Sequence, residues 1–597
     1  MTPHSLDLQS LATAYRQGLK PSDLFATLLD RASRDKHHTW ISLLPAEKVL
    51  AMARRLDECD ATDLPLYGVP FAIKDNIDLA GHPTTAACPD FCYIPESSAT
   101  VVAKLMAAGA IPLGKTNMDQ FATGLNGTRS PYGACRNAFN PAYISGGSSA
   151  GSAVAVACGQ VSFSLGTDTA GSGRVPAAFN NLVGLKPSGG LLSTKGIVPA
   201  CRSLDAVSIF ALTAADAQQV FAVAQGYDED DPYSRPAQPH GRRFQAGERF
   251  RFGVPQPAQL AFFGDGTNPA LFAAAVARME ALGGTGVPVD FAPFLAVARL
   301  LYDGPWVAER YHAIRSFIDK QPESVFPVTR AITLAASKAS AVDAFDAFYA
   351  LKNLQRQCAS VWEDLSLMLT PTAGFHPSIA AIEADPIGLN THLGYYTNFM
   401  NLLGYSAVAL PAAFRPDGLP FGVSIFAQAD QDIPLLELAA RWQASTNLPL
   451  GASGQPLPPA ANLSSPIADG QIRLAVCGAH LSGLPLNWQL VDRGARLIAT
   501  VRSAAEYQLY ALPGGPPLRP GMVRVDKEGV AIDMEVWEMP GTAFGSFVAA
   551  IPSPLGIGKI RLADGSEVCG FLCETAGVAG AENISRFGGW RAWLGSR

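Results

Sequence analysis

The chain has 597 residues, of which 48% are hydrophobic and 16% are charged, and its net charge is −6. This composition excludes an intrinsically disordered chain, and a net acidic sequence without a long basic block argues against a nucleic-acid partner. The length exceeds what one hydrophobic core usually organises, so two or three domains are expected.

The sequence carries no sign of export or membrane insertion. No basic stretch followed by an apolar run stands at its start, and its most apolar stretch, 153–165, is interrupted by polar residues and too short to span a bilayer. Ten cysteines are scattered along the chain, and the closest pairs lack the partners of a zinc site. We therefore expect reduced thiols, no metal, no membrane contact and a cytoplasmic location.

The first two hundred residues predict an α/β arrangement. Helical spacing of apolar residues predicts helices in the first sixty, with Ser22 as the N-cap of one of them. From 66 to 210 short apolar runs then alternate with small-residue helices. The runs and helices are Pro70–Ile73, Val101–Ala108, Ile111–Leu113 and Ser152–Cys158.

The rest of the chain divides at a change of composition. Residues 269–367 have a largely helical pattern, followed by strands at Val408–Pro411 and Phe421–Ile425 and a helix at Leu435–Trp442. Residues 449–470 are rich in Pro, Ser and Ala and are typical of a linker. We therefore predict a first domain over 1–448 and a small, β-rich α+β domain over 471–597. The β-like stretches of that second domain are Arg473–Val476, Arg496–Val501 and Val530–Val536.

Three segments of the first domain carry candidate chemistry. Lys74 directly follows an apolar strand-like run, where it either reaches solvent or is desolvated, with a lowered pKa that would make it a base. Ser145–Ser152 is Gly/Ser-rich, and within it Ser149 formally fits the nucleophile elbow of α/β-hydrolases, although a poor strand precedes it. In Gly166–Arg174, Ser172 stands among small residues. Small residues let backbone N–H groups converge on one point, which an oxyanion hole requires.

Taken together, these segments and their spacings closely resemble the amidase signature family over about residues 1–445. Gly114-Lys-Thr-Asn-Met-Asp-Gln-Phe-Ala and Leu185-Lys-Pro-Ser are also typical of it. The resemblance implies an α/β fold with a central mixed sheet flanked by helices. It implies Ser172 as nucleophile, Ser148 after a cis peptide bond as proton relay and Lys74 as base. The N–H groups of Thr169, Ala170, Gly171 and Ser172 would form the oxyanion hole, and Asp168 and Arg174 would brace this loop.

Two further segments resemble the allophanate hydrolases within this family. They are Phe121-Ala-Thr-Gly124-Leu-Asn-Gly-Thr-Arg129-Ser-Pro-Tyr-Gly and Tyr302-Asp-Gly-Pro-Trp-Val-Ala-Glu-Arg310-Tyr. Allophanate is urea that carries a carboxylate, and a guanidinium binds a carboxylate bidentately. The resemblance implies Gly124, Tyr302 and Arg310 as substrate-binding residues, whereas an arginine of a helix taken by itself is usually a solvated charge. It implies no cofactor, a homodimer and a functional link to urea carboxylase.

The second domain resembles the additional C-terminal domain of allophanate hydrolases. Its opening segment, Val476–Asn487, is also distantly similar to γ-glutamyl cyclotransferases. This similarity implies that the second domain has a fold resembling that of the γ-glutamyl cyclotransferases. Those enzymes use a glutamate further on, whereas Ala543–Ile551 has no acid, which argues against cyclotransferase activity. His480 is the candidate proton donor for decarboxylation of the N-carboxycarbamate product, or else a histidine that packs the loop.

Two other functions stay open at this point. The chain could be a general amidase or the A subunit of an aminoacyl-tRNA amidotransferase, although the C-terminal domain and Arg310 argue against both. It could also be a non-catalytic binding protein on the same scaffold, which the presence of Lys74, Ser148 and Ser172 disfavours.

Overall fold

The computed structural model describes residues 5–59, 64–238, 244, 249–458 and 471–596. It divides into a larger unit, residues 1–237 and 244–461, and a smaller unit, residues 238–243 and 462–597. Most of the linker predicted over 449–470 lies outside the described residues, and the predicted domain boundaries stay a prediction. In the described part of the chain no helix is both long and apolar enough to cross a membrane.

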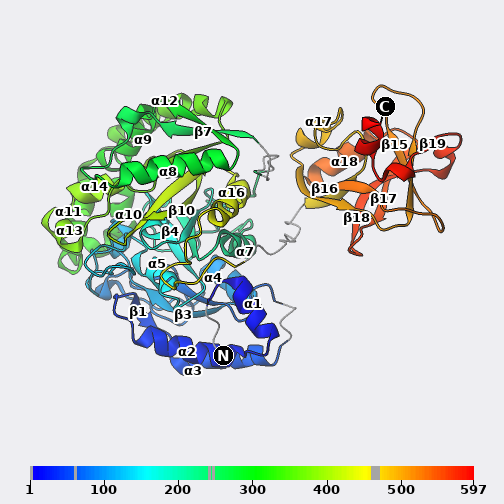
Figure 1. The fold of residues 1–597 in the computed structure, drawn as a ribbon. Helices are drawn as coiled ribbons and strands as arrows, with labels where there is room; N and C mark the ends of the chain where they lie inside the picture. Colours follow the sequence, from blue (N-terminus) through cyan, green and yellow to red (C-terminus); the bar gives the residue numbers. More distant parts are fainter. Residues whose placement is uncertain (1–4, 60–63, 239–243, 245–248, 459–470, 597) are drawn as a thin grey trace. The chain divides into compact units, whose positions relative to one another are not determined.

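The larger unit is organised by one mixed sheet of eleven strands (Figure 1). Pairing is parallel between β2 and both β3 and β4, and again between β7 and both β8 and β9, whereas the strands between these groups are antiparallel. In spatial order the strands are β1 (Trp40–Leu43), β3 (Ile111–Thr116), β2 (Pro70–Lys74), β4 (Phe163–Asp168), β6 (Ala206–Ala211), β5 (Val183–Lys186), β10 (Ser406–Phe414), β11 (Pro420–Ala427), β9 (Leu367–Pro371), β7 (Phe250–Pro255) and β8 (Gly284–Val289).

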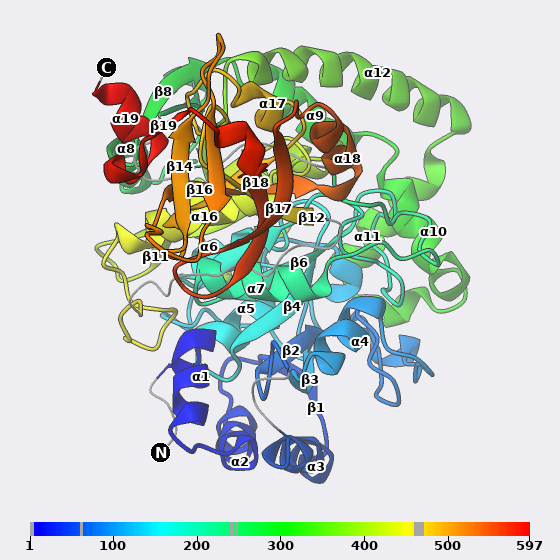
Figure 2. The same ribbon diagram turned by 90° about the vertical axis from the view of Figure 1, so that its right-hand side faces the viewer.

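Helices flank this sheet (Figures 1 and 2). Helix α5 packs on β2, β3 and β4, and α6 on β5, β10 and β11, whereas α7 and α16 pack together beside β6 and β10. The helices are α1 (Leu8–Arg16), α2 (Pro21–Ser33), α3 (Ala46–Asp57), α4 (Thr100–Ala107), α5 (Ala150–Ala157), α6 (Val175–Phe179), α7 (Ala214–Ala224), α8 (Asn268–Ala281), α9 (Ala292–Asp303), α10 (Val307–Ile318), α11 (Pro327–Ala335), α12 (Ala341–Ala359), α13 (Ile379–Ala384), α14 (Gly388–Leu393), α15 (Phe399–Leu402) and α16 (Asp432–Ala444).

The apolar runs of the sequence form the inner strands because both faces of these strands are covered. Every residue of β2 and β4 is buried, which is why these strands show no alternation of apolar and polar residues. Across the β2–β4 pair, Phe71 stacks on Phe163 with ring centroids 5.1 Å apart. The predicted α/β alternation and the mixed sheet flanked by helices are confirmed.

Three local predictions were wrong. Ser22 is not an N-cap, because α2 begins at Pro21 and Lys20 precedes it. Strand β1 interrupts the helices of the first sixty residues, and β8 lies within the region predicted to be largely helical. Both are outer strands of the sheet, so partner strands rather than a strong local pattern determine them.

The smaller unit is β-rich, as predicted, with a five-stranded and a three-stranded sheet. The first contains, in spatial order, β13 (Arg496–Arg502), β16 (Asp533–Pro540), β12 (Gln471–Val476), β18 (Glu567–Cys573) and β17 (Leu555–Arg561), and the second β15 (Pro520–Arg524), β14 (Tyr507–Ala511) and β19 (Glu582–Asn583). Its helices are α17 (Trp488–Val491), α18 (Gly541–Ala549) and α19 (Trp590–Gly595).

Candidate active site

The candidate residues meet where three parallel strands end. Lys74 is the last residue of β2, which lies between β3 and β4 in the sheet. Ser148 stands just before α5, the helix that packs on the same three strands, and Ser172 lies in the loop between β4 and α6. Because parallel strands share one carboxyl edge, the fold brings these distant side chains together, which is the usual position of a site in such a sheet.

A continuous hydrogen-bonded line joins the three residues. Lys74 Nζ lies 2.8 Å from Ser148 Oγ, and Ser148 Oγ lies 3.0 Å from Ser172 Oγ. The peptide bond between Gly147 and Ser148 is cis, as the resemblance predicted. All three side chains are buried, so a proton can move along this line without passing through bulk water.

The surroundings of Lys74 favour its neutral form. Complete burial lowers the pKa of the Lys74 ammonium from 10.5 to about 7, although the nearby carboxylate of Asp119 acts in the opposite direction. Lys74 Nζ also lies 2.7 Å from Thr167 Oγ1 on β4. A neutral amine can donate an N–H to Thr167 and keep its lone pair for the Ser148 proton. Of the two alternatives that the sequence left open for Lys74, the structure shows the buried side chain and not the one that reaches solvent.

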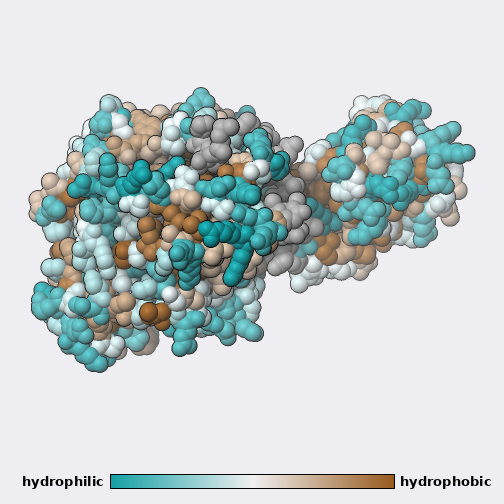
Figure 3. Space-filling view, turned by 90° about the horizontal axis from the view of Figure 1, so that it is seen from below, coloured by the Kyte–Doolittle hydropathy of each residue, from teal (hydrophilic) through white to brown (hydrophobic). Residues whose placement is uncertain are grey.

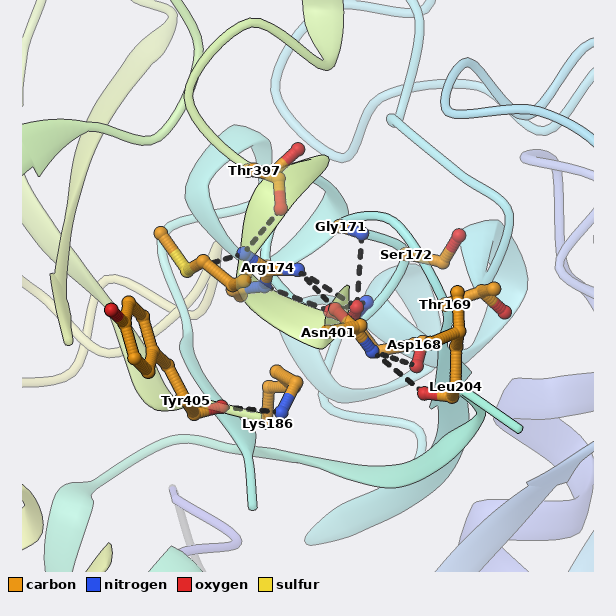
Figure 4. Close-up of polar contacts among 12 residues, drawn as sticks. Asp168, Thr169, Gly171, Ser172, Arg174, Lys186, Leu204, Thr397, Asn401 and Tyr405 are labelled. Carbon is orange, nitrogen blue, oxygen red and sulfur yellow. Dashed lines mark hydrogen bonds and ion pairs between the residues drawn. The ribbon is translucent and has the colours of Figure 1, made fainter. Parts of the chain in front are cut away.

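The loop that carries Ser172 is braced by a buried ion pair (Figure 4). Arg174 donates from Nε and Nη2 to the two carboxylate oxygens of Asp168, both at 2.9 Å, and both side chains are fully buried. Despite its burial, the pKa of Asp168 is lowered, because Arg174 stabilises the carboxylate. Asn401 extends the brace by accepting a hydrogen bond from Arg174 and donating one to the Asp168 carbonyl. The predicted structural role of this pair is confirmed.

The same brace changes the predicted oxyanion hole. The Gly171 N–H donates to Asp168 Oδ1 at 2.9 Å. This donor is therefore already used within the protein and is not free to bind an oxyanion. Thr169 is instead anchored through its side chain, because its hydroxyl donates to the partly buried carboxylate of Asp205. The N–H groups of Thr169, Ala170 and Ser172 stay the predicted donors to an oxyanion.

Ser149 does not have the surroundings of a nucleophile. Its Oγ donates to the Thr167 carbonyl at 3.1 Å and accepts from the Thr167 N–H at 3.3 Å, so it ties the start of α5 to β4. The residues before Ser149 form turns, bends and two isolated bridges rather than the strand that a nucleophile elbow requires. The geometry therefore favours Ser172 over Ser149.

Arg310 is a buried cation beside this site. It lies on α10, is 4% exposed, and its Nη1 donates to the Ala122 carbonyl and Thr123 Oγ1, both at 3.2 Å. Its guanidinium lies 5.6 Å from the centre of the Tyr302 ring, and its buried Nε has no hydrogen-bond partner among the described residues. A desolvated guanidinium with unused donors can bind a carboxylate strongly.

Gly124 links Arg310 to the nucleophile. Its carbonyl lies 3.5 Å from Ser172 Oγ, and the preceding residue is Thr123. A Cβ at Gly124 would lie 2.6 Å from Asp119 Oδ2, and the backbone φ of +156° is one that other residues rarely adopt. Glycine is therefore required for the chain to pass between Asp119 and the site.

Sequence reasoning missed two residues that shape this turn. Asp119 accepts hydrogen bonds from the N–H groups of Asn126, Gly127 and Arg129, which fold the loop that carries Gly124. The buried guanidinium of Arg129 donates to the Thr123 carbonyl at 2.9 Å, so Arg129 and Arg310 hold the same turn. Both residues stand in the quoted motifs, but no spacing rule indicates which backbone groups they bind.

In the smaller unit, His480 follows β12 and packs among aromatic rings. Its ring is stacked on Phe571 at 5.0 Å between centroids and meets Phe547 edge-on at 5.3 Å. Its Nε2 lies 3.0 Å from Gln489 Oε1, and burial lowers the pKa of the imidazole. These contacts are those of a histidine that packs its loop, and a role in proton transfer stays a prediction.

The sequence analysis also did not single out Glu535, an acidic residue that contacts the loop carrying His480. Glu535 on β16 is buried and accepts hydrogen bonds from the N–H of Ser482 at 2.8 Å, from Trp537 Nε1 at 3.1 Å and from Arg591 at 2.9 Å. It was missed because it precedes the stretch in which the cyclotransferase comparison placed an acid.

A mixed sheet with a buried lysine and two serines in line at its carboxyl edge is the arrangement that the resemblance to the amidase signature family predicted. Comparison with known proteins shows that the chain belongs to the Amidase family, whose model matches residues 23–436. A second model, described as the allophanate hydrolase C-terminal domain, matches residues 472–595.

Individual relatives cover both parts of the chain. The urea amidolyase of Saccharomyces cerevisiae is 44% identical over 574 residues, which are 93% of this chain and 31% of that protein, so the chain spans about a third of that relative. The solved structure of Kluyveromyces lactis allophanate hydrolase is 40% identical, with a TM-score of 0.83, and the match covers 99% of both chains. The K. lactis urea amidolyase structure is 41% identical, with a TM-score of 0.84, over 99% of this chain and 36% of that one.

Proposed function

We propose that this chain hydrolyses the terminal amide of allophanate and so takes part in urea degradation. The line from Lys74 through Ser148 to Ser172 carries the proposal, because it supplies a nucleophile, a relay and a neutral base in hydrogen-bond contact. Its relatives named allophanate hydrolase and urea amidolyase support the substrate.

The reaction follows from the order of these groups. Ser172 Oγ attacks the amide carbonyl while its proton passes to Ser148 and the Ser148 proton passes to Lys74. When the tetrahedral intermediate collapses, the C–N bond breaks and the same relay returns a proton to the leaving nitrogen, which departs as ammonia. Water then attacks the acyl-enzyme and loses a proton to the relay. The bond between the acyl carbon and Ser172 Oγ breaks, the relay returns that proton to Ser172 Oγ, and N-carboxycarbamate is released.

We assign the selection of an anionic substrate to Arg310. Tyr302 and Gly124 complete the substrate-binding surface. The Thr123–Gly124 turn extends from the guanidinium to within 3.5 Å of the nucleophile, so a short substrate can contact both ends. Allophanate fits this arrangement because only one nitrogen separates its carboxylate from its amide carbonyl.

For the smaller unit we propose decarboxylation of N-carboxycarbamate, with His480 as the proton donor. The product loses carbon dioxide to give carbamate, which breaks down to a second ammonia and carbon dioxide. A homodimer, a cytoplasmic location and a functional link to an enzyme that carboxylates urea complete the proposal. The fused relatives named urea amidolyase support that link.

Ammonia release from allophanate, malonamide and a simple aryl amide, measured in parallel, tests the substrate. We expect allophanate to be turned over with the highest kcat/KM, because it alone carries a carboxylate for Arg310. A preference for the aryl amide would show a general amidase, and labelling of Ser172 by a fluorophosphonate separates both outcomes from a non-catalytic scaffold.

A further inference from the structure

Asp205 is an acidic residue that the proposed reaction does not use, although it contacts the loop that carries Ser172. Acidic side chains usually lie in solvent, and many hydrophilic residues lie on the face of the protein shown in Figure 3. Asp205 is instead partly buried, and its Oδ1 accepts a hydrogen bond from the Thr169 hydroxyl. The N–H groups of Ala200 and Cys201 also donate to this carboxylate, at 2.8 and 3.2 Å. Three donors of the protein therefore converge on Asp205.

The register of the sheet brings Asp205 and Thr169 together. Asp168 is the last residue of β4 and Ala206 is the first residue of β6, and these two residues are directly opposite each other in the antiparallel pair. Thr169 and Asp205 are the next residues beyond this pair. Because both strands are fully buried, their register is strongly specified, and so is the place where the two side chains meet.

The segment Ala200–Asp205 is itself held on two sides. Asn401 Nδ2 donates to the Leu204 carbonyl at 3.0 Å and to the Asp168 carbonyl at 2.8 Å (Figure 4). On the other side, Ser203 Oγ donates to Glu309 on α10 at 2.7 Å. A carboxylate on a segment anchored in this way can fix the orientation of the hydroxyl that it binds.

The charge of Asp205 also acts on the base of the site. Burial lowers the pKa of Lys74 to about 7, whereas the carboxylate of Asp205 acts in the opposite direction. The other charged groups that act on Lys74 are Asp119, Asp168 and Arg310. Removal of the Asp205 charge alone should therefore make the Lys74 ammonium less stable, which gives a readout that a purely structural residue would not change.

We propose that Asp205 is a positioning residue for amide hydrolysis, which holds Thr169 so that the Thr169 N–H points at the oxyanion of the tetrahedral intermediate. Asp205 touches no reacting atom and acts through Thr169. Donors that are fixed before the charge develops need no reorganisation during the reaction, which is the main advantage of an oxyanion hole. The proposal rests on the amide hydrolysis proposed above, but not on allophanate as the substrate.

Measurement of kcat and KM for malonamide tests this role. Asp205→Ala should lower kcat on the order of a hundredfold with little change in KM, because a displaced oxyanion donor is lost mainly in the transition state. Asp205→Asn can still accept the Thr169 hydroxyl through its amide oxygen, so it should keep more activity than Asp205→Ala. Its kcat/KM should reach the plateau at a lower pH than that of the wild type, because the charge that stabilises the Lys74 ammonium is gone.

Asp230→Asn is the matched control for the loss of charge. Asp230 and Asp205 line the same cavity of about 240 Å³, but Asp230 pairs with the exposed Lys195 at 2.6 Å. Asp230→Asn should therefore change neither kcat nor the pH of the plateau. Thr169→Val removes the hydroxyl on which Asp205 acts, so the double variant Asp205→Ala/Thr169→Val should be no slower than the slower single variant.

Labelling of Ser172 by a fluorophosphonate separates this proposal from the proposed function. The phosphoryl oxygen of the probe enters the oxyanion hole, so Asp205→Ala should be labelled more slowly than the wild type even if none of the amides is a substrate. A wild type that neither reacts with the probe nor hydrolyses any amide overturns the proposed function and this proposal with it. With an active wild type, an unchanged kcat and labelling rate in Asp205→Ala, or losses that multiply in the double variant, overturn the positioning role alone.

Discussion

Burial of Lys74 predicts a particular pH dependence of ammonia release. With its pKa lowered to about 7, about half of the Lys74 side chains are neutral at pH 7. An ordinary lysine with a pKa of 10.5 would be neutral in about 0.03% of molecules at that pH, so burial raises the amount of usable base on the order of a thousandfold.

The assay is kcat/KM for ammonia release from malonamide between pH 5.5 and about 9, because this substrate does not itself titrate there. We expect the rate to rise about tenfold between pH 6 and 8 and then to level off, since the neutral fraction of Lys74 grows from about 0.09 to about 0.9. An ordinary lysine would give a rise of about a hundredfold and no plateau. Lys74→Arg should be inactive at every pH, because guanidinium does not lose its proton.

The same shift affects stability, which gives a check that does not depend on turnover. Unfolded Lys74 keeps its proton up to about pH 10.5, whereas folded Lys74 loses it above about pH 7. Between these values the unfolded state binds more protons, so the contribution of Lys74 to stability increases with pH. The free energy of unfolding of the wild type should therefore rise relative to Lys74→Met across this window. A constant difference, or a rate that is flat from pH 6 to 8, would refute the assignment of Lys74 as a buried base.

The other predictions concern the nucleophile, the anion contact and the smaller unit. Ser172→Ala should abolish ammonia release with an unchanged melting temperature, whereas Ser149→Ala should keep substantial activity; the reverse result would restore the elbow assignment. Arg310→Ala should lower kcat/KM for allophanate by about ten- to a hundredfold, because a charge-assisted contact contributes about 1.5–3 kcal/mol, and should affect aryl amides much less. An equal loss on both substrates would make Arg310 a structural residue. A chain that ends at about residue 465 should release the first ammonia but not accelerate the second, and His480→Ala in the full chain should uncouple the two steps in the same way. Identical kinetics of both ammonia signals in these variants would exclude a catalytic role for the tail.

The sequence predicted elements best where a short segment carries a distinctive pattern by itself. The buried strands β2 and β4 were predictable because strands covered on both faces are continuous apolar runs. Ser172 and Ser148 could be singled out because their segments and spacings resemble the amidase signature family, not because either segment taken alone indicates a site. Strands β1 and β8 could not be predicted in this way, because they are outer strands whose residues are mostly only partly buried.

The sequence by itself determined the family, the α/β order of the larger unit and the residue types of the candidate site. Only the tertiary structure decided the state of Lys74, because its pKa depends on complete burial and on Asp119, 45 positions further along the chain. Tertiary structure likewise decided that the Gly171 N–H is committed to Asp168 and that Arg310 is a buried cation rather than a solvated one. The physical reason is the same in each case: the charge state and free donors of a group depend on which distant atoms exclude water from it.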